Sequence, residues 1–415
     1  MDQKVPLYST NTVPHKNFNP IKGKGAIFWE CNGQEVIDLS SQTVNLLFGQ
    51  RHPKIHQSVV NQLGKITFID EDFHSSIHYD AMKKLYKLLP KDLTVLNIRM
   101  NDASSAVECA IKQAKKYTKK TTILTCDGIY LGQNTQTISI RGWGESRKEI
   151  LRGSSENVIF GRLPYNFEVD EQDKYIDNVI DEFENIVKEN HMDLACVLLD
   201  PVMISAGICM APTLQKYITA ANKVSKAYNV PFILDESQSY GWVPDVTLSK
   251  HWDLDVDALI LGKGVAGGFP LAVCASKPYL DGLMRGDADY THGGHPISVA
   301  ALSATCDLID LERDKFAITA QYLEHLLNKK TKNYKYIFTH GLGLIRAVQI
   351  NKYNNYEKDK KIVEQVADLA LKRGVYVRKY GKTLGIKPPR SITKQQLYKS
   401  INILFETINE VVDKY

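Results

Sequence analysis

The chain has 415 residues, of which 43% are hydrophobic and 24% are charged, and its formal net charge is +5. These values are typical of a soluble globular protein with room for two domains, or for one large α/β domain with an appendage. The basic residues are scattered, which argues against a nucleic-acid-binding surface. No apolar run approaches the ~20 residues of a membrane-spanning helix. We therefore expect neither nucleic acid nor membrane as a partner.

Cysteine usage and the N-terminus suggest the compartment. The seven cysteines are dispersed, with no CxxC pair and no cluster with histidine. Such a set predicts reduced thiols and no metal site. The N-terminal sequence MDQKVPLYSTNTVPHKN lacks the apolar segment of a signal peptide. We expect a cytoplasmic protein.

The first part of the chain is predicted to form an extended arm, a hairpin and two helices. Residues 1 to about 25 are polar and rich in proline and asparagine. Asn32-Gly33 lies between two apolar runs, which is a strong hairpin signal. Amphipathic patterns then predict helices at 55–63 and 79–89.

From residue 93 to residue 263, short apolar runs alternate with amphipathic helical patterns. Strands are predicted at 93–100, 122–125, 195–199, 232–234 and 258–261, and helices at about 103–117, 179–189 and 214–228. Strands that alternate with helices in this way form a mostly parallel sheet with helices on both faces. In such sheets the ligand site lies at the carboxyl ends of the strands.

Two residues at predicted strand ends suggest the chemistry. The run Phe232 to Leu234 ends on Asp235, and the run from 258 to 261 ends on Gly-Lys-Gly with Lys263 at its centre. A lysine amine can form an imine with a carbonyl, and an ionised carboxylate can keep a pyridine nitrogen protonated. This pair is the equipment of a pyridoxal phosphate (PLP) site. Taken alone, Asp235 could be a turn former and Lys263 a solvated loop lysine.

Two further segments fit a cofactor site beside this pair. The strand that ends at Met100 runs into NDASSAVE and a helix, and the N-terminus of a helix attracts phosphate. The alternative for this turn is an ordinary N-cap without a ligand. Tyr130 follows the next strand, where its ring could stack on a flat cofactor or pack in the core.

The pattern changes after residue 314. A long helix is predicted from 296 to 311. A compact α+β unit follows, with helices at 317–328, 361–373 and 394–413 and strands near 343–350 and 375–378. His292 and His295 alone are weak support for a metal, because no carboxylate or thiol accompanies them.

Together these segments resemble the class III (ornithine/4-aminobutyrate type) aminotransferases of PLP fold type I. The resemblance extends from about Gly25 to Ile408. Its most specific parts are LDESQ at 234–238, LGKG at 261–264 followed by GGFPL, and THGGHP at 291–296; the family has DEVQ, LGKGLGGGLPL and TFGGNP. The resemblance implies a large domain with a mostly parallel seven-stranded sheet flanked by helices, and a smaller α+β domain. We place the N-terminal arm and hairpin at 1–60, the PLP-binding domain at 61–312 and the small domain at 313–415.

The resemblance also implies roles for particular residues. Lys263 is expected to hold PLP as an imine and to shuttle protons, and Asp235 to pair with the pyridinium nitrogen. Thr291 is expected to reach the phosphate of a neighbouring subunit, which implies a homodimer with its active site at the interface. The other expected cofactor contacts are Ala103 and Ser104 on the phosphate, Tyr130 on the ring face, and Gln238 near the ring 3′-oxygen.

Departures from the family pattern bear on the substrate. Ornithine-type members carry an arginine where this chain has Gln133, and a glutamate where it has Ser205. Loss of this pair argues against ornithine, acetylornithine and 4-aminobutyrate. Arg378 matches the mobile arginine that some amine:pyruvate-type members use to bind the keto-acid carboxylate, and we expect Arg378 and Gln133 to line the substrate site. Leu131 and Ser237 also replace the usual histidine and valine beside the ring.

The sequence thus predicts an aminotransferase that moves an amino group between an amine or amino acid and a keto or aldehyde acceptor, through pyridoxamine phosphate. An amino-acid racemase or epimerase, or an aminomutase, would need the same lysine and aspartate and stays open as an alternative. A catalytically idle binding protein on this fold is disfavoured by the intact pair Lys263 and Asp235.

Overall fold

A computed structural model describes residues 18–415 except 74, 145–146, 152–156, 168–170 and 209–211, and it omits the side chains of 147 and 148. Its core is a seven-stranded sheet in the order β4-β10-β9-β8-β7-β5-β6. The strands are β4 Val95–Met100, β5 Thr122–Cys126, β6 Val158–Gly161, β7 Leu194–Leu199, β8 Phe232–Asp235, β9 Ala258–Leu261 and β10 Ala272–Ser276.

All neighbouring strands of this sheet are parallel except for the two pairings of β10, which are antiparallel. The predicted mostly parallel sheet is therefore confirmed. Strands β6 and β10 were not predicted from the sequence. Strands β7, β8 and β9 are buried along their whole length, as expected when helices cover both faces.

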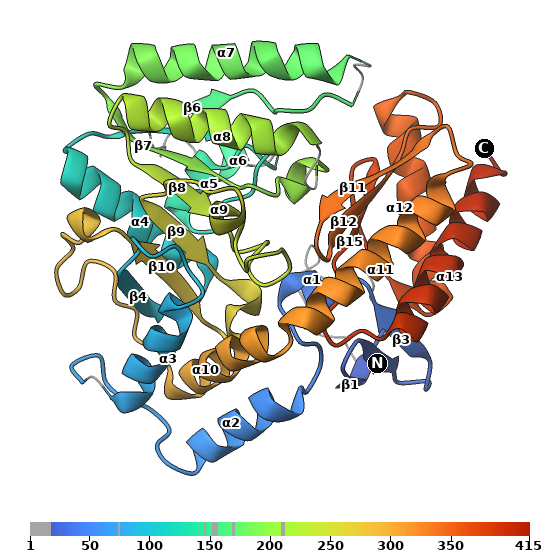
Figure 1. Ribbon diagram of the computed structural model, residues 1–415, viewed down its shortest axis with the longest axis horizontal. Helices are drawn as coiled ribbons and strands as arrows, with labels where there is room; N and C mark the ends of the chain where they lie inside the picture. The colour runs from blue at the N-terminus through green and yellow to red at the C-terminus, as the bar shows by residue number, and fades with distance from the viewer. Residues whose placement is uncertain (1–17, 74, 145–146, 152–156, 168–170, 209–211) are drawn as a thin grey trace, which may run out of the picture.

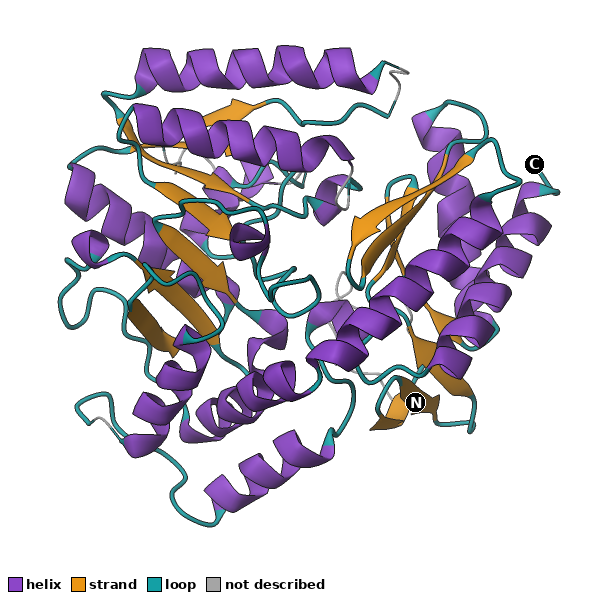
Figure 2. Ribbon diagram, in the orientation of Figure 1, coloured by secondary structure: helices purple, strands orange, loops and turns teal. Residues whose placement is uncertain are grey.

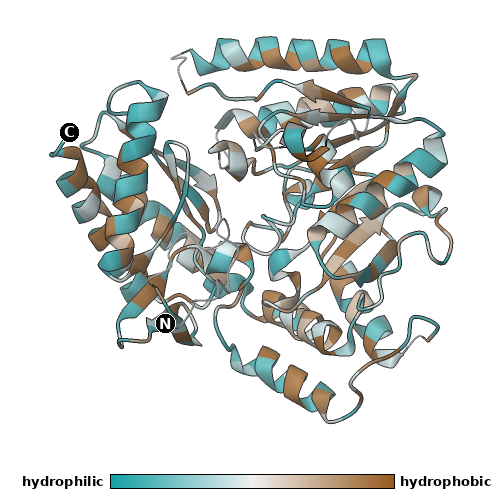
Figure 3. Cartoon of the chain, turned by 180° about the vertical axis from the view of Figure 1, so that it is seen from behind, coloured by the Kyte–Doolittle hydropathy of each residue, from teal (hydrophilic) through white to brown (hydrophobic). Residues whose placement is uncertain are grey.

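Helices cover the sheet on both sides (Figures 1 and 2). Helix α4 packs against β7, β9 and β10, while α7 and α8 lie side by side next to β6 and β8. In Figure 3 the outer helices carry both hydrophilic and hydrophobic turns, the pattern of amphipathic helices on a buried sheet. The helices up to residue 312 are α1 Ser41–Val44, α2 Pro53–Leu63, α3 Ser76–Tyr86, α4 Ala103–Thr118, α5 Thr135–Ile140, α6 Arg147–Leu151, α7 Gln172–Asn190, α8 Pro212–Ala227, α9 Leu248–His251 and α10 Pro296–Leu311.

Two smaller sheets complete the described fold. Strands β11 Ile337–Leu342, β12 Ile345–Ile350, β15 Thr383–Ile386 and β14 Arg378–Tyr380 form one antiparallel sheet. The predicted hairpin forms from β2 Ile27–Glu30 and β3 Glu35–Asp38, which pair around Asn32-Gly33. With β1 Pro20–Lys24 and β13 Val375–Tyr376 they make the other sheet, so the N-terminal strands join the C-terminal part of the chain. The remaining helices are α11 Arg313–Thr331, α12 Tyr356–Lys372 and α13 Lys394–Val412.

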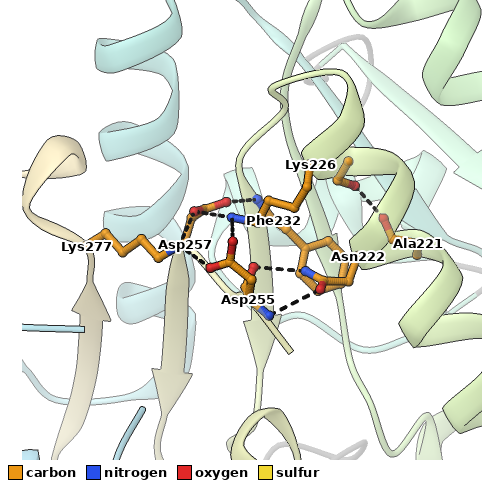
Figure 4. Close-up of polar contacts among 8 residues, drawn as sticks. Ala221, Asn222, Lys226, Phe232, Asp255, Asp257 and Lys277 are labelled. Carbon is orange, nitrogen blue, oxygen red and sulfur yellow. Dashed lines mark hydrogen bonds and ion pairs between the residues drawn. The ribbon is translucent and has the colours of Figure 1, made fainter. Parts of the chain in front are cut away.

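A charged cluster fixes the central sheet at the end opposite to the predicted site (Figure 4). The buried carboxylate of Asp257, just before β9, accepts hydrogen bonds from the Phe232 amide at 2.8 Å and from Lys226 at 2.5 Å. Lys277, just after β10, pairs with the same carboxylate at 3.2 Å. Because buried charges need such partners, the cluster holds the amino ends of β8 and β9 in register with β10. The opposite ends of β8 and β9 carry Asp235 and lead into Lys263.

Candidate active site

The carboxyl ends of the parallel strands surround a cavity of about 340 Å³. Asp235 reaches it from β8, and Lys263 from the short 3-10 turn η2 (Lys263–Ala266) after β9. Ala103 and Ser104, at the start of α4, and Tyr130, after β5, line the same cavity. The structure therefore brings together these five predicted residues, which lie up to 160 positions apart in the sequence (263 − 103).

The amine of Lys263 is held inside this cavity. Its Nζ donates a 2.9 Å hydrogen bond to the Ser237 hydroxyl. Its backbone has φ 49°, a left-handed conformation that is rare for a residue with a side chain and often marks a functional site. Burial lowers the pKa of Lys263, and the charge of Lys387 lowers it further, while Asp235 opposes both. A lysine with a depressed pKa is a better nucleophile at neutral pH.

Asp235 is a buried carboxylate at the tip of β8. Its Oδ1 accepts a 2.9 Å hydrogen bond from the Ser237 amide. Burial raises its pKa, and the charge of Lys263 counteracts this effect. A cation placed against Asp235 would favour the ionised form. The carboxylate is therefore suited to pairing with a protonated ring nitrogen.

The start of α4 forms an anion-binding end of the cavity. The Asp102 side chain accepts a hydrogen bond from the Ser105 amide at 3.0 Å, which caps the helix and leaves the first turn facing the cavity. Glycines keep this end compact, since a Cβ at Gly262 would lie 2.9 Å from the Ala103 Cβ and one at Gly132 would lie 2.8 Å from the Ser104 Oγ. The helix dipole and free amides of such an end favour a phosphate.

Gln238 lies behind the cavity and does not line it. Its Oε1 accepts a 3.2 Å hydrogen bond from Nζ of Lys387, a lysine whose side chain is fully buried. Lys387 was not singled out from the sequence. It precedes Pro388 and Pro389, and a lysine beside two prolines resembles an ordinary loop residue, so no local pattern indicated a buried ammonium.

Arg378 lies at the start of β14 and contacts the N-terminal segment. Its guanidinium hydrogen-bonds the Thr43 hydroxyl, and its backbone amide donates to the Ser40 hydroxyl at 2.9 Å. The four residues of α1 all have φ between 47° and 64°, so this turn is left-handed. Such a turn costs on the order of 1 kcal/mol per residue, and strain of this kind persists where the surrounding structure holds it. Asn45, which directly follows the turn, lines the cavity.

Gln133 is exposed, and a buried arginine that the sequence analysis missed holds its side chain. Nη1 of Arg141 donates to Gln133 Oε1 at 2.9 Å and to the Gly132 carbonyl at 3.1 Å. The guanidinium lies over the rings of Tyr130 and Trp143, at 5.6 and 5.5 Å from their centroids. Ser205 donates instead to the Gly128 carbonyl at 3.1 Å. Gln133 and Ser205, two of the positions that depart from the family pattern, therefore hydrogen-bond Arg141 and the Gly128 carbonyl, respectively.

Thr291 is exposed and does not line the cavity within its own chain. This placement is compatible with a contact to a second subunit, and its predicted role stays a prediction. The predicted roles of Gln238, Arg378 and Gln133 likewise stay predictions.

Comparison with known proteins identifies the family. Residues 8–408 match the family described as aminotransferase class-III. Ornithine aminotransferase 2 of Staphylococcus aureus is 28% identical over 408 residues, covering 94% of both chains. The [LysW]-aminoadipate semialdehyde/glutamate semialdehyde transaminase of Sulfurisphaera tokodaii is 24% identical over 399 residues, covering 95% of both.

Solved structures support the fold. The adenosylmethionine-8-amino-7-oxononanoate aminotransferase of Methanocaldococcus jannaschii superposes with a TM-score of 0.83 at 24% identity, over 95% of this chain and 93% of that one. An aminotransferase of Vibrio fluvialis, solved in its PMP-bound form, gives a TM-score of 0.87 at 19% identity, over 98% and 96%. These structures confirm the predicted fold type, and the family match confirms the predicted cofactor class. The chain belongs to the class III aminotransferases, which are PLP-dependent enzymes.

Proposed function

We propose that Lys263 and Asp235 hold PLP between them, with Lys263 as its covalent anchor and Asp235 opposite its ring nitrogen. The supporting observation is that both side chains line one cavity, together with Tyr130 and the start of α4. The residues fit the group: a nucleophilic amine, a buried carboxylate, an aromatic ring and a phosphate-binding helix end are all present. Ala103 and Ser104 would hold the phosphate, and Tyr130 would cover the ring.

The bound cofactor supplies an electron sink that lets a proton leave the substrate carbon next to the amine. The chain supplies the group that moves this proton. The amine of Lys263 has a pKa lowered by burial, so in its free form it can accept the proton and return it elsewhere. The Ser237 hydroxyl, 2.9 Å away, keeps the amine oriented in the cavity. The enzyme would thus move an amino group from an amine or amino acid to a keto or aldehyde acceptor.

We further propose that this chain does not prefer ornithine as its donor. The relative in Staphylococcus aureus bears that name, but here Gln133 and Ser205 stand in place of the arginine and glutamate of ornithine-type members. Both side chains are engaged by other groups, Gln133 by Arg141 and Ser205 by Gly128. Arg378, beside the left-handed turn, is the proposed partner of the acceptor's carboxylate.

We also propose a homodimer in which Thr291 of one subunit completes the phosphate site of the other. The exposure of Thr291 supports this arrangement. A cytoplasmic location is supported by the six cysteines in the described part of the chain, which are all free thiols. Among the described helices, none has both the length and the apolar composition needed to cross a bilayer.

The central experiment compares Lys263→Met with Lys329→Met, which changes an exposed lysine of α11. Both purified variants are incubated with PLP and treated with borohydride. We expect the wild type and Lys329→Met to retain a covalently reduced cofactor after denaturation, and Lys263→Met to retain none. Label on another lysine would refute the proposed anchor. Conversion of the bound cofactor to its amine form by donor alone would then support transamination over racemisation.

A further inference from the structure

A second cavity of about 340 Å³ lies away from the catalytic one, between the loop after Trp242, helices α10 and α11, and the β11–β12 turn. Its walls are mostly apolar and include Val243, Val246, Ile309, Phe316 and Leu342. Three arginines also line it, Arg313, Arg346 and Arg390. A cavity of this size, with an apolar wall and a few polar groups, has the character of a small-molecule site.

Arg390 is the distinctive group of this cavity. Only 4% of the residue is exposed, yet its Nε has no hydrogen-bond partner among the described residues. Nη2 donates to the Glu312 carbonyl at 3.2 Å, and the guanidinium lies 4.6 Å from the Phe316 ring centroid. Burial lowers the pKa of Arg390 to about 10. A buried guanidinium with unused donors and no paired carboxylate is costly unless an anion completes it.

The acidic residues of the cavity do not fill this need. Asp245 pairs with His251 at 2.9 Å, and Glu324 pairs with Arg346 at 3.2 Å. The Glu312 backbone carbonyl accepts from Arg390, while the Glu312 carboxylate pairs with Lys315 at 3.2 Å and acts on Arg390 only through its charge, which opposes the effect of burial on the pKa. Arg313, the third arginine, is exposed and pairs with Asp310 at 2.9 Å. Arg390 is therefore the buried cation that a bound anion would meet, and the apolar walls would contact the rest of the ligand.

The wall of this cavity is strained and touches the catalytic turn. Asp245 and Val246 have φ of 57° and 75°, and a positive φ is a clear outlier for a β-branched valine. Trp242, at the start of the same loop, is fully buried, and its ring occupies the space that a Cβ on Gly264 would need, at 2.6 Å. Gly264 directly follows Lys263. The loop that lines this cavity therefore begins at a residue packed against the turn that carries the catalytic amine.

We propose that this cavity binds a small organic carboxylate with an apolar body, whose carboxylate pairs with Arg390. The apolar body would lie against Phe316 and the Val243–Val246 wall. This site is distinct from the catalytic cavity, so the proposal does not depend on the roles assigned to Lys263 or Asp235.

Phenylacetate and its neutral analogue phenylacetamide are suitable probes, and binding to the PLP-saturated protein can be measured by calorimetry. We expect phenylacetate to bind and phenylacetamide to bind at least about tenfold more weakly, because only the acid makes a charge-assisted pair. Arg390→Met replaces the guanidinium by an unbranched apolar side chain and should weaken phenylacetate binding by a similar factor. Ala320→Leu, which fills the cavity from α11 and leaves Arg390 in place, should weaken both probes.

A carboxylate could also enter the catalytic cavity, and Arg378→Ala separates the two sites. Binding that survives Arg378→Ala and is lost in both Arg390→Met and Ala320→Leu supports the proposal. Binding that is lost in Arg378→Ala and kept in Arg390→Met overturns it, as does equal affinity for acid and amide, or no binding by the wild type. The visible absorbance and thermal midpoint of each variant show whether it is folded. If Arg390→Met does not fold, the loss of binding in Ala320→Leu still tests the proposal.

Discussion

Asp200 and Asp235 are buried carboxylates at the ends of the neighbouring strands β7 and β8, and the charge of Asp235 affects the ionisation of Asp200. Burial, together with the negative charge of Asp235, raises the pKa of Asp200 to about 7. Asp200 Oδ1 accepts a 2.8 Å hydrogen bond from the Val202 amide, while Oδ2 is buried without a partner among the described residues. Asp200 is therefore the carboxyl that stays protonated while Asp235 pairs with a cation.

This relationship predicts a pH dependence of stability. Asp200 is neutral in the folded protein up to about pH 7 but ionises in the unfolded chain near its ordinary pKa of 3.8. As the pH rises, the Asp200 carboxyl therefore loses its proton in the unfolded chain before it does so in the folded protein. Its contribution to stability falls between pH 3.8 and about pH 7. The full loss, reached above pH 7, is about 4 kcal/mol, because each pH unit between the unfolded and the folded pKa contributes about 1.4 kcal/mol.

Asp200→Asn cannot ionise, so it should remove this loss. We expect the variant to gain stability relative to the wild type as the pH rises from 5 to 8, measured by urea unfolding of cofactor-free protein. Asp314→Asn, at an exposed position of α11, is the matched control and should track the wild type. Parallel curves for Asp200→Asn and the wild type would show that Asp200 is ionised in the fold.

Lys387 gives a prediction about the catalytic amine. Its buried ammonium lowers the pKa of Lys263, so Lys387→Met should raise it. The readout is a pH titration of the visible absorbance of the PLP-bound protein, whose midpoint should move upward. Lys379→Met is the control, because Lys379 lies on the neighbouring strand β14, is exposed and pairs with Asp368. An unchanged midpoint would mean that Lys387 only holds Gln238.

The sequence predicted the parts of this fold that follow strong local patterns. Strands β7, β8 and β9 are short apolar runs with polar ends, and α4 and α8 have clear amphipathic periods. The type and the order of these five elements could therefore be predicted. Strand β10 was missed because Ala272, Cys274 and Ala275 have small side chains that give no strong strand signal. Its position is set by antiparallel pairing with β4 and β9, which no local pattern encodes.

The residues of the candidate site likewise fall into those that the sequence could predict and those that it could not. Lys263, Asp235 and Tyr130 could be placed because each lies at the end of a recognisable strand or shortly after it. Arg141 and Lys387 could not, because their partners Gln133 and Gln238 are brought to them by tertiary packing. The sequence showed that an arginine is absent at position 133, but the approach of the Arg141 guanidinium to that position required the structure.

Arg378 should affect acceptor binding more than the chemical step. Its guanidinium hydrogen-bonds Thr43 and lies 5.6 Å from the Tyr380 ring centroid, so the proposed role requires it to turn from these partners toward the carboxylate of the acceptor. We expect Arg378→Ala to raise KM for a keto acid by about 10- to 100-fold, the value of a hydrogen bond to a charged group, with a smaller change in kcat. An aldehyde acceptor without a carboxylate is the control substrate, and its KM should not change. Equal losses for both acceptors would assign Arg378 a structural role.

The proposed shared site can be tested by mixing two inactive chains. Thr291→Glu should repel the phosphate held by the partner subunit, and Lys263→Met removes the catalytic amine of its own subunit. In a heterodimer of the two, one site has both defects, while the other combines an intact Lys263 with an intact Thr291. Co-expression with different tags and two-step purification should therefore recover activity that neither parent has. Lys263→Met paired with Asp235→Ala is the matched control. Each of these changes damages the site of the chain that carries it, so both sites of that heterodimer stay defective. Recovery in neither pair, or a monomer by light scattering, would refute the shared site, because Thr291 does not line the cavity of its own chain and would then have no role there.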